Sequence, residues 1–424
     1  MSRTVKPEYI ETATGKIPSD WTFGKIENVC DILDSRRVPI NSNERSKIKG
    51  KIPYYGANGV VDYINKYLFN EDLILLAEDG GNFDQYQTRP IAYQISGKSW
   101  VNNHAHILRA KLGINQNWVF YALVHKNITQ YVNPGTRSKL NQGDLRKIPI
   151  PLPPLPEQYK IAAILSSVDH AIQATKKVIE KTKRLKQGLM QQLLTKGIPG
   201  WHTEFKEVKI GYIKLDIPKK WKFKKLVYTA DSFVGGPFGS DLKVEHYTSK
   251  GVRVIQLQNI GEGEFYDENK VFTSEKKYED LIKCSAISGD IIIAKMADPV
   301  ARACILPENN GQKKWLLASD AIRLRVCKDN NAKFVMYMIN SPLIRKIAES
   351  RSTGTTRLRI GLVELRNLPF LIPPLEEQIM ISDILGSVDN KIDFLKLEIM
   401  NLVKLKKSLM QNLLTGKIRV KTNE

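Results

Sequence analysis

Cysteine is scarce in this chain of 424 residues, and long apolar runs are missing. The four cysteines lie far apart without a Cys-x-x-Cys pair, which argues against a disulfide framework and against a zinc site. The opening residues contain no apolar stretch of the kind that secretory signals carry. The most apolar window, 291–306, includes three charged residues and is too short to cross a bilayer. We therefore expect a cytoplasmic protein that does not enter a membrane.

Acidic residues are also in short supply. The chain has 44 Asp and Glu against 65 Lys and Arg, so its formal net charge is +21. Such an excess favours a polyanionic partner, most often nucleic acid, although a membrane surface or plain solubility would also use it. The 42% of hydrophobic residues is typical of a globular protein, and the length suffices for two to four domains.

Recognisable catalytic motifs are missing as well. Gly97–Ser99 resembles the end of a phosphate-binding loop but lacks the glycine that opens such a loop. His104 and His106 have no third ligand at a helpful spacing, and Asp290 with Lys295 frames an apolar run that reads as a buried strand. No methyltransferase tetrapeptide or hydrolase motif is found. The sequence therefore predicts no catalytic residue, no metal site and a recognition module rather than an enzyme.

The sequence instead contains an internal repeat. Leu145–Ile198 aligns without gaps with Leu365–Ile418, and 26 of the 54 positions are identical. A weaker match, Ile-Pro-x-x-Trp, lies upstream at Ile17–Trp21 and Ile217–Trp221. This repeat predicts an alternation of variable domains and shared regions, each shared region holding a proline connector and a long helix. The predicted segments are a first variable domain at 1–148, a first shared region at 149–198, a second variable domain at 199–367 and a second shared region at 368–424.

Each shared region opens with prolines, which favour an extended connector, and continues with Leu-x-Glu-Gln at the start of a helix. Apolar residues then alternate at spacings of four and three, which indicates the seam of a coiled coil. Packing of each helix on its own domain is the alternative, but about 38 residues make a helix near 57 Å, longer than a typical domain. The predicted seam consists of Ile161, Leu165, Val168, Ile172, Ile179, Leu189 and Leu193 in the first helix, and of Ile381, Leu385, Val388, Ile392, Leu395, Ile399, Leu402, Leu409 and Leu413 in the second.

The two helices are expected to pair with each other. If the repeat is arranged about a pseudo-two-fold axis, the pair is antiparallel and each helix holds its own domain at an opposite end. Thr175 and Thr182 interrupt the first seam, and Lys186 and Lys406 occupy the same seam position in the two copies, where they would fix register or orientation.

The variable domains combine short strand-like runs, such as Leu73–Leu76 and Ile291–Ala294, with one helical stretch each. The predicted fold class is therefore α+β. Their polar loops carry basic residues that suit phosphate or base contacts, although a solvated surface is the simpler explanation for any single residue. Gly235–Ser240 is either a tight structural loop or a ligand cradle. The candidate DNA contacts are Arg36, Arg37, Lys47, Lys49, Arg137, Lys139, Lys243, Lys276, Lys277, Arg351, Arg357 and Arg359.

The sequence resembles the specificity (S) subunit of a type I restriction–modification system. The resemblance rests on PLPPLPEQYKIAAIL, IPPLEEQIMISDIL, LLTKGI, LLTGKIRV, IPYYGANGVVDYI, LILLAEDGG and GGPFGSDL, and it covers nearly the whole chain. It implies two target-recognition domains held apart by two conserved helices in an antiparallel coiled coil. Each domain would read one half of a bipartite, asymmetric site in double-stranded DNA, with helix length setting the gap between the halves.

The resemblance also implies partners in a prokaryotic cytoplasm. Two methyltransferase subunits would dock on the helices, and restriction (endonuclease and translocase) subunits would join them. The chain would bind no cofactor, because S-adenosylmethionine, ATP and Mg would be held by the partner subunits, and methylation would fall on adenine. A standalone DNA-binding scaffold without methyltransferase partners is the alternative, whereas a self-contained nuclease–methyltransferase would need motifs that are absent.

Overall fold

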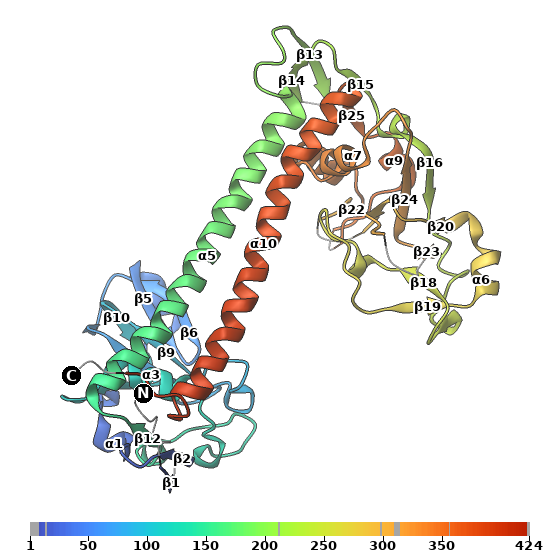
Figure 1. Cartoon of the computed structure of the whole chain (residues 1–424). Helices are drawn as coiled ribbons and strands as arrows, with labels where there is room; N and C mark the ends of the chain where they lie inside the picture. The colour runs from blue at the N-terminus through green and yellow to red at the C-terminus, as the bar shows by residue number, and fades with distance from the viewer. Residues whose placement is uncertain are drawn as a thin grey trace, which may run out of the picture. The chain divides into compact units, whose positions relative to one another are not determined.

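The computed structural model describes residues 8–12, 15–210, 213–296, 299–308, 314–355 and 357–421, so Thr356 of the second Gly-Thr-Thr-Arg loop lies outside the described residues. The chain divides into two compact units. Unit 1 combines Met1–Lys177 with Leu397–Glu424, and unit 2 is Val178–Lys396. Unit 2 is thus one continuous stretch, whereas unit 1 is assembled from both ends of the chain (Figure 1).

Unit 1 opens with a hairpin of β1 (Tyr9–Thr12) and β2 (Gly15–Pro18), followed by two four-stranded sheets. The sheet β4-β11-β8-β9 uses Cys30–Ile32, Ala105–Ala110, Leu73–Ala77 and Ala92–Ile95. The sheet β6-β5-β10-β7 uses Gly59–Ile64, Lys49–Gly56, Lys98–Val101 and Phe69–Asn70. The short helices are α1 (Ile26–Val29), α2 (Ser42–Lys47), α3 (Gln116–Val124) and α4 (Gln142–Leu145).

Unit 2 repeats this order with β13 (Phe205–Ile210) and β14 (Ile213–Pro218) as its hairpin. The sheet β16-β24-β21-β22 uses Ala230–Gly235, Ala321–Val326, Ile291–Ala294 and Ala303–Ile305. The sheet β17-β19-β18-β23-β20 uses Tyr247–Thr248, Val271–Thr273, Val252–Ile255, Trp315–Leu317 and Ser285–Ala286. The short helices are α6 (Glu275–Asp280), α7 (Ala332–Ile339), α8 (Pro342–Ser350) and α9 (Leu362–Arg366).

The two units share a sheet plan that their variable sequences conceal. In unit 1, β11 pairs antiparallel with β4 and β8, and β9 lies beyond β8; in unit 2, β24 pairs antiparallel with β16 and β21, and β22 lies beyond β21. The second sheet of each unit contains one parallel pair, β5 with β10 and β18 with β23. The apolar runs in β8 and β21 are buried at every position, as their composition predicts. The repeat therefore extends through the variable domains as a backbone plan.

The proline connectors are strands. β12 (Pro149–Leu152) pairs with β3 (Thr22–Lys25), and β25 (Pro369–Ile372) pairs with β15 (Lys222–Lys225) in the same register. Proline has no amide hydrogen, so in β12 the amides of Ile150 and Leu152 are the donors available to β3. The extended conformation predicted for the connectors is thus fixed by pairing with a strand near the start of each domain.

The two long helices are α5 (Leu155–Lys196) and α10 (Leu375–Leu413), and their segments run antiparallel within each unit. In unit 1, Lys406 Nζ lies 2.6 Å from Asp169 Oδ1. In unit 2, Lys186 Nζ lies 2.5 Å from Asp389 Oδ1. These ion pairs come from equivalent residues of the two copies, so the predicted antiparallel coiled coil is confirmed and the seam lysines have partners on the opposite helix. None of the sixteen predicted seam residues is exposed.

The first turns of each helix also pack into their own domain. Ile161 and Leu165 belong to the same apolar core as Trp118 of α3, and Leu413 of α10 joins them there. In unit 2, Ile381 and its neighbours occupy the matching place beside α7. Both arrangements considered from the sequence therefore occur in different parts of the helices. Among the described residues, no helix has the length and apolar character needed to span a membrane.

Candidate nucleic-acid interface

The shared motifs Ile-Pro-x-x-Trp and Leu-x-Glu-Gln meet in each unit. Trp21 is buried and donates from Nε1 to Glu157 Oε2 at 3.1 Å, and Trp221 donates in the same way to Glu377 Oε2 at 2.8 Å. Ile-Pro-x-x-Trp is thus bound to Leu-x-Glu-Gln in both copies. Because a buried carboxylate without partners is costly, each glutamate specifies the position of its tryptophan.

The segment after each helix completes this anchor with a different side chain. In unit 1, Arg419 donates to Glu157 and, with two hydrogen bonds of 2.8 and 2.7 Å, to Asp20. In unit 2, His202 Nε2 lies 2.7 Å from Glu377 Oε1. The hydrogen bonds to Arg419 hold the pKa of Asp20 below its ordinary value. The C-terminal segment is therefore a structural part of the first domain.

The Gly-Thr-Arg segments form equivalent closed loops. The loop Asn133–Lys139 is closed by two backbone hydrogen bonds between its end residues, and Thr353–Arg359 is closed in the same way. The strand end beneath each loop is bound by equivalent backbone hydrogen bonds, from Leu140 N to Glu78 O and from Ile360 N to Lys295 O. We call each closed loop together with this strand end a loop frame. The two loop frames share these backbone hydrogen bonds and differ in their side chains.

The loop frame of unit 1 is rich in acidic partners. Glu78 binds both Arg37, at 2.5 Å, and Lys139, at 3.3 Å. Asp79 binds both His104 and Arg137 at 2.9 Å. Arg137 and Lys139 remain about half exposed, at 61% and 49% of their side-chain surface, so they are presented to solvent in fixed positions.

The loop frame of unit 2 is mainly basic. Lys295 stands where unit 1 has Glu78, and its Nζ donates to the Ser319 carbonyl at 2.9 Å. Burial and the nearby charge of Arg359 lower the pKa of Lys295. Arg359 stands where unit 1 has Lys139, and it binds Asp320 at 2.9 Å while 54% of its side chain is exposed. The same frame therefore presents different hydrogen-bonding groups in the two units, as two different base sequences would require.

A glycine loop follows β16 in unit 2. A side chain at Gly236 would meet the Ala318 carbonyl oxygen at 1.8 Å, so only glycine fits there. This contact favours the tight-loop interpretation of Gly235–Ser240. Phe238 at the loop tip is 82% exposed. In unit 1, the segment that follows the equivalent strand holds Arg36 and Arg37.

The predicted DNA contacts differ in how freely they are presented. Arg37 is 15% exposed and donates to Asp34, Glu78 and the Ala105 carbonyl, so it supports the frame of unit 1 from within. Arg351 donates to the Asn367 carbonyl, beside the proline connector. DNA binding by these residues stays a prediction. The remaining candidates are half-buried Lys277 and the exposed Arg36, Lys47, Lys49, Arg137, Lys139, Lys243, Lys276, Arg357 and Arg359.

The residues that the sequence suggested for catalysis or metal binding are bound by other groups of the fold. Asp290 is bound by Arg325 at 2.8 and 2.9 Å, at the opposite end of β21 from Lys295. His106 is fully buried, with Nδ1 2.6 Å from Asp34 Oδ2 and Nε2 2.8 Å from the Leu140 carbonyl oxygen. Asp34, Glu78 and His106 lie close enough together to hold a metal ion. Arg37 and Lys139 already neutralise these carboxylates, so we interpret the group as an ion-pair network that holds the first loop frame.

This network gives unit 1 a pH dependence. Burial alone would raise the pKa of Asp34, but hydrogen bonds from His106 and the Ile107 amide, with the charge of Arg37, hold it below its ordinary value. A carboxyl with a lowered folded-state pKa stabilises the fold above its unfolded-state pKa, near 4, and this contribution is lost as pH falls through the folded-state pKa. Asp34→Asn should therefore destabilise unit 1 by about 2 kcal/mol at pH 7 and by progressively less below pH 4. Urea unfolding between pH 3 and 7 tests this, with exposed Asp84→Asn as the control; a difference independent of pH would contradict it.

Comparison with known proteins identifies the family to which this architecture belongs. A family model described as "Type I restriction modification DNA specificity domain" matches residues 18–184 and 241–405, one copy in each half. The chain belongs to this family. The type I restriction enzyme MjaVIII specificity subunit of Methanocaldococcus jannaschii is 29% identical over 432 residues, which cover 96% of this chain and 95% of that protein.

Two solved structures share the fold of this family member. The S subunit of a type I restriction–modification system from M. genitalium matches with a TM-score of 0.57 and 15% identity, over 96% of this chain and 99% of that one. A chain from a structure of complex assembly and conformational transition of the type I R-M system matches with a TM-score of 0.55 and 14% identity, over 95% of this chain and all of that one. These matches confirm the predicted fold class, and the named relatives are prokaryotic.

Several residues of the specificity-domain loop frames were missed by sequence reasoning. Glu78 and Asp79 follow a buried strand and precede two glycines, a turn signal that marks a strand end. Lys295 ends an equivalent strand but has no such glycines after it. Their shared position comes from backbone pairing with loops about 60 residues away, and backbone pairing leaves no residue pattern.

Proposed function

We propose that this family member is the DNA-specificity subunit of a type I restriction–modification complex, with each domain reading one half of a bipartite, asymmetric site. The observation that carries the proposal is the pair of loop frames, which share the same backbone hydrogen bonds and differ in their side-chain chemistry. The positions that Glu78 and Lys139 occupy in unit 1 are occupied by Lys295 and Arg359 in unit 2. Two domains with the same contacts would read the same half-site, so this difference supports an asymmetric site.

The long helices are proposed to set the spacing and to dock two methyltransferase subunits. One supporting observation is an exposed apolar face on α10, where Leu397, Met400 and Val403 are 53, 55 and 51% exposed at helical spacing. An apolar helix face left in solvent is characteristic of a protein interface. Restriction subunits would join through this assembly. That a relative of the same fold was solved in work on complex assembly fits the proposal.

The chain is proposed to do no chemistry itself. S-adenosylmethionine would bind the methyltransferase, and ATP with Mg would bind the restriction subunit. The pairing of the ionisable groups supports this, because Asp290, His106 and Glu78 all have protein partners that hold the fold. The complex would direct methylation to adenine within the site and restriction to DNA that lacks the mark.

The test is the adenine-methylation map of the native genome with and without this gene. We expect a split motif with two unlike halves to lose its methylation completely in the deletion strain and to regain it when the gene is restored. An unchanged map, with no methyltransferase copurifying with the tagged chain, would contradict the proposal and favour a standalone DNA-binding scaffold.

A further inference from the structure

Strand β15 of unit 2 carries a concentration of positive charge that the fold does not explain. Between 219 and 225 the sequence reads Lys-Lys-Trp-Lys-Phe-Lys-Lys. Lys219 pairs with Glu204 at 3.0 Å. Lys220, Lys222, Lys224 and Lys225 are exposed, and among the described residues no carboxylate pairs with them. Four like charges this close together repel one another, so they weaken the fold unless a partner neutralises them.

Unit 1 provides an internal control for the requirements of the fold. Its equivalent strand, β3, pairs with a proline strand in the same register but reads Ser-Asp-Trp-Thr-Phe-Gly-Lys between 19 and 25. Asp20 replaces Lys220, Thr22 replaces Lys222 and Gly24 replaces Lys224. The tryptophan, the phenylalanine and the last lysine are retained. The three added lysines are therefore not needed to form this ribbon.

Lysines on an unpaired strand edge also discourage aggregation, which is the competing explanation. Strand β3 pairs with its proline strand in the same way as β15 does, yet it contains one lysine. Aggregation control alone would not explain why one of two equivalent edges is so much more basic. A specific polyanionic partner on unit 2 explains the asymmetry.

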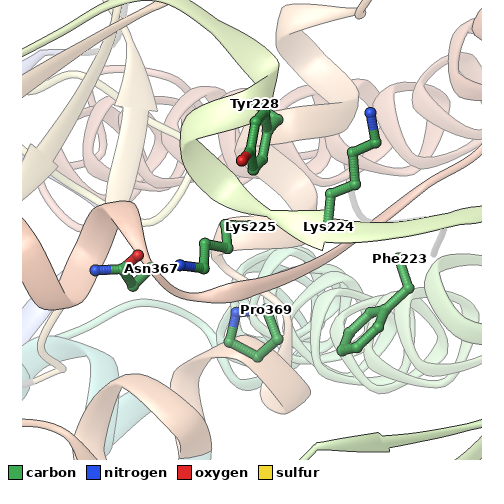
Figure 2. A pocket seen from close by; sticks show the side chains of 6 residues that line it. All are labelled: Phe223, Lys224, Lys225, Tyr228, Asn367 and Pro369. Atoms are coloured by element: carbon green, nitrogen blue, oxygen red, sulfur yellow. The ribbon is translucent and has the colours of Figure 1, made fainter.

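Aromatic side chains lie among these lysines. Tyr228 is 62% exposed and Phe223 is 38% exposed, and Lys224 Nζ is 5.5 Å from the centre of the Tyr228 ring. Together with Lys225, Asn367 and Pro369 they line a cavity of about 550 Å³ (Figure 2). Unit 1 has Asn28 where Tyr228 stands and Lys147, paired with Asp144, where Asn367 stands. The tyrosine of the rim is thus specific to unit 2, like the charge, whereas the phenylalanine has an exposed counterpart in Phe23 of unit 1.

We propose that this ribbon, which we call the β15 patch (Lys222–Lys225 with Tyr228), binds a single-stranded nucleic acid segment. The lysines would contact successive phosphates, and the exposed rings of Phe223 and Tyr228 would stack on unpaired bases. In duplex DNA the faces of the bases are stacked on one another, so a duplex would contact the lysines but not the rings of Phe223 and Tyr228. The four residues of β15 span about 13 Å, which matches two or three nucleotides. This site is separate from the loop frames and does not depend on their proposed function.

The experiment measures binding of a fluorescent dT12 strand to the full chain. With about three phosphates neutralised, the logarithm of the affinity should fall against that of the salt concentration with a slope near −2. Lys222→Gln/Lys224→Gln/Lys225→Gln should weaken binding at least tenfold and flatten that slope, whereas the matched triple arginine variant should retain both. Tyr228→Ala should weaken binding about 5- to 50-fold without changing the slope.

A charge-matched control removes three other lysines of unit 2. Lys209 and Lys214 lie on the neighbouring hairpin and Lys219 in the turn between that hairpin and β15. The variant Lys209→Gln/Lys214→Gln/Lys219→Gln should bind dT12 as the unchanged chain does. Unaltered dT12 affinity in the β15 triple glutamine variant would overturn the proposal, and loss of a copurifying subunit in that variant would then assign the patch to an acidic protein. Equal competition by a mixed-sequence duplex, with no effect of Tyr228→Ala, would overturn the single-strand assignment. None of these results depends on the genomic methylation map, so the two proposals can fail separately.

Discussion

Leu395→Asp is expected to lower the free energy of unfolding of unit 2 by about 3–5 kcal/mol. Leu395 is 5% exposed in the seam between α5 and α10, and the ion pair of Lys186 with Asp389 sets the register of the helices nearby. A carboxylate at this position would lose its hydration inside an apolar seam. Since domains are typically stable by only 5–15 kcal/mol, the cooperative transition of unit 2 should shift strongly or disappear.

The same helix supplies the control two residues away. Leu397 is 53% exposed, so Leu397→Asp removes an identical side chain and adds an identical charge without burying it. Its unfolding transition should stay within about 0.5 kcal/mol of the unchanged chain. Thermal and urea unfolding followed by circular dichroism compare the two variants. If both melt like the unchanged chain, the seam contributes little to the stability of unit 2 and the coiled coil is not what holds it together.

The seam and the helices are predictable from the sequence because their information is local. A spacing of four and three residues identifies Leu395 as buried and Leu397 as exposed without reference to any other part of the chain. The buried strands at Leu73–Ala77 and Ile291–Ala294 are predictable for the same reason. The lysines at the seam are recognisable as unusual, but their partners are not, because Asp169 and Asp389 lie on the opposite helix more than 200 residues away.

The loop frames are different, since they are built from backbone groups. Any residue other than proline offers the same amide and carbonyl, so Lys139 and Arg359, or Glu78 and Lys295, occupy one position without resembling each other. The contact of Trp21 with Glu157 was hidden for a related reason. Both motifs are visible in the sequence, but nothing in either shows that they meet across 136 residues. Repetition in the sequence identified the helices, whereas only three-dimensional pairing identifies the loop frames.

Under the proposed function, the loop frames predict a reciprocal pair of specificity changes. Lys139→Ala should weaken discrimination at the half-site read by unit 1, and Arg359→Ala at the half-site read by unit 2, each by about 1–3 kcal/mol, or roughly 5- to 150-fold. Each variant should leave the other half-site as selective as before. The measurement is methylation of duplexes with substitutions in one half-site at a time by the assembled methyltransferase complex, so that each variant serves as the control for the other.

These substitutions test side chains without dismantling the loops. The closing hydrogen bonds use the backbone nitrogen and oxygen of Lys139 and Arg359, which alanine also provides. A loss that is confined to one half-site therefore reports a lost base contact rather than a collapsed loop. If each variant instead weakened binding to all sequences equally and reduced the salt dependence by about one phosphate, both residues would be backbone contacts. Base reading would then have to come from neighbouring groups with different chemistry in the two units, such as Asp320 and His104.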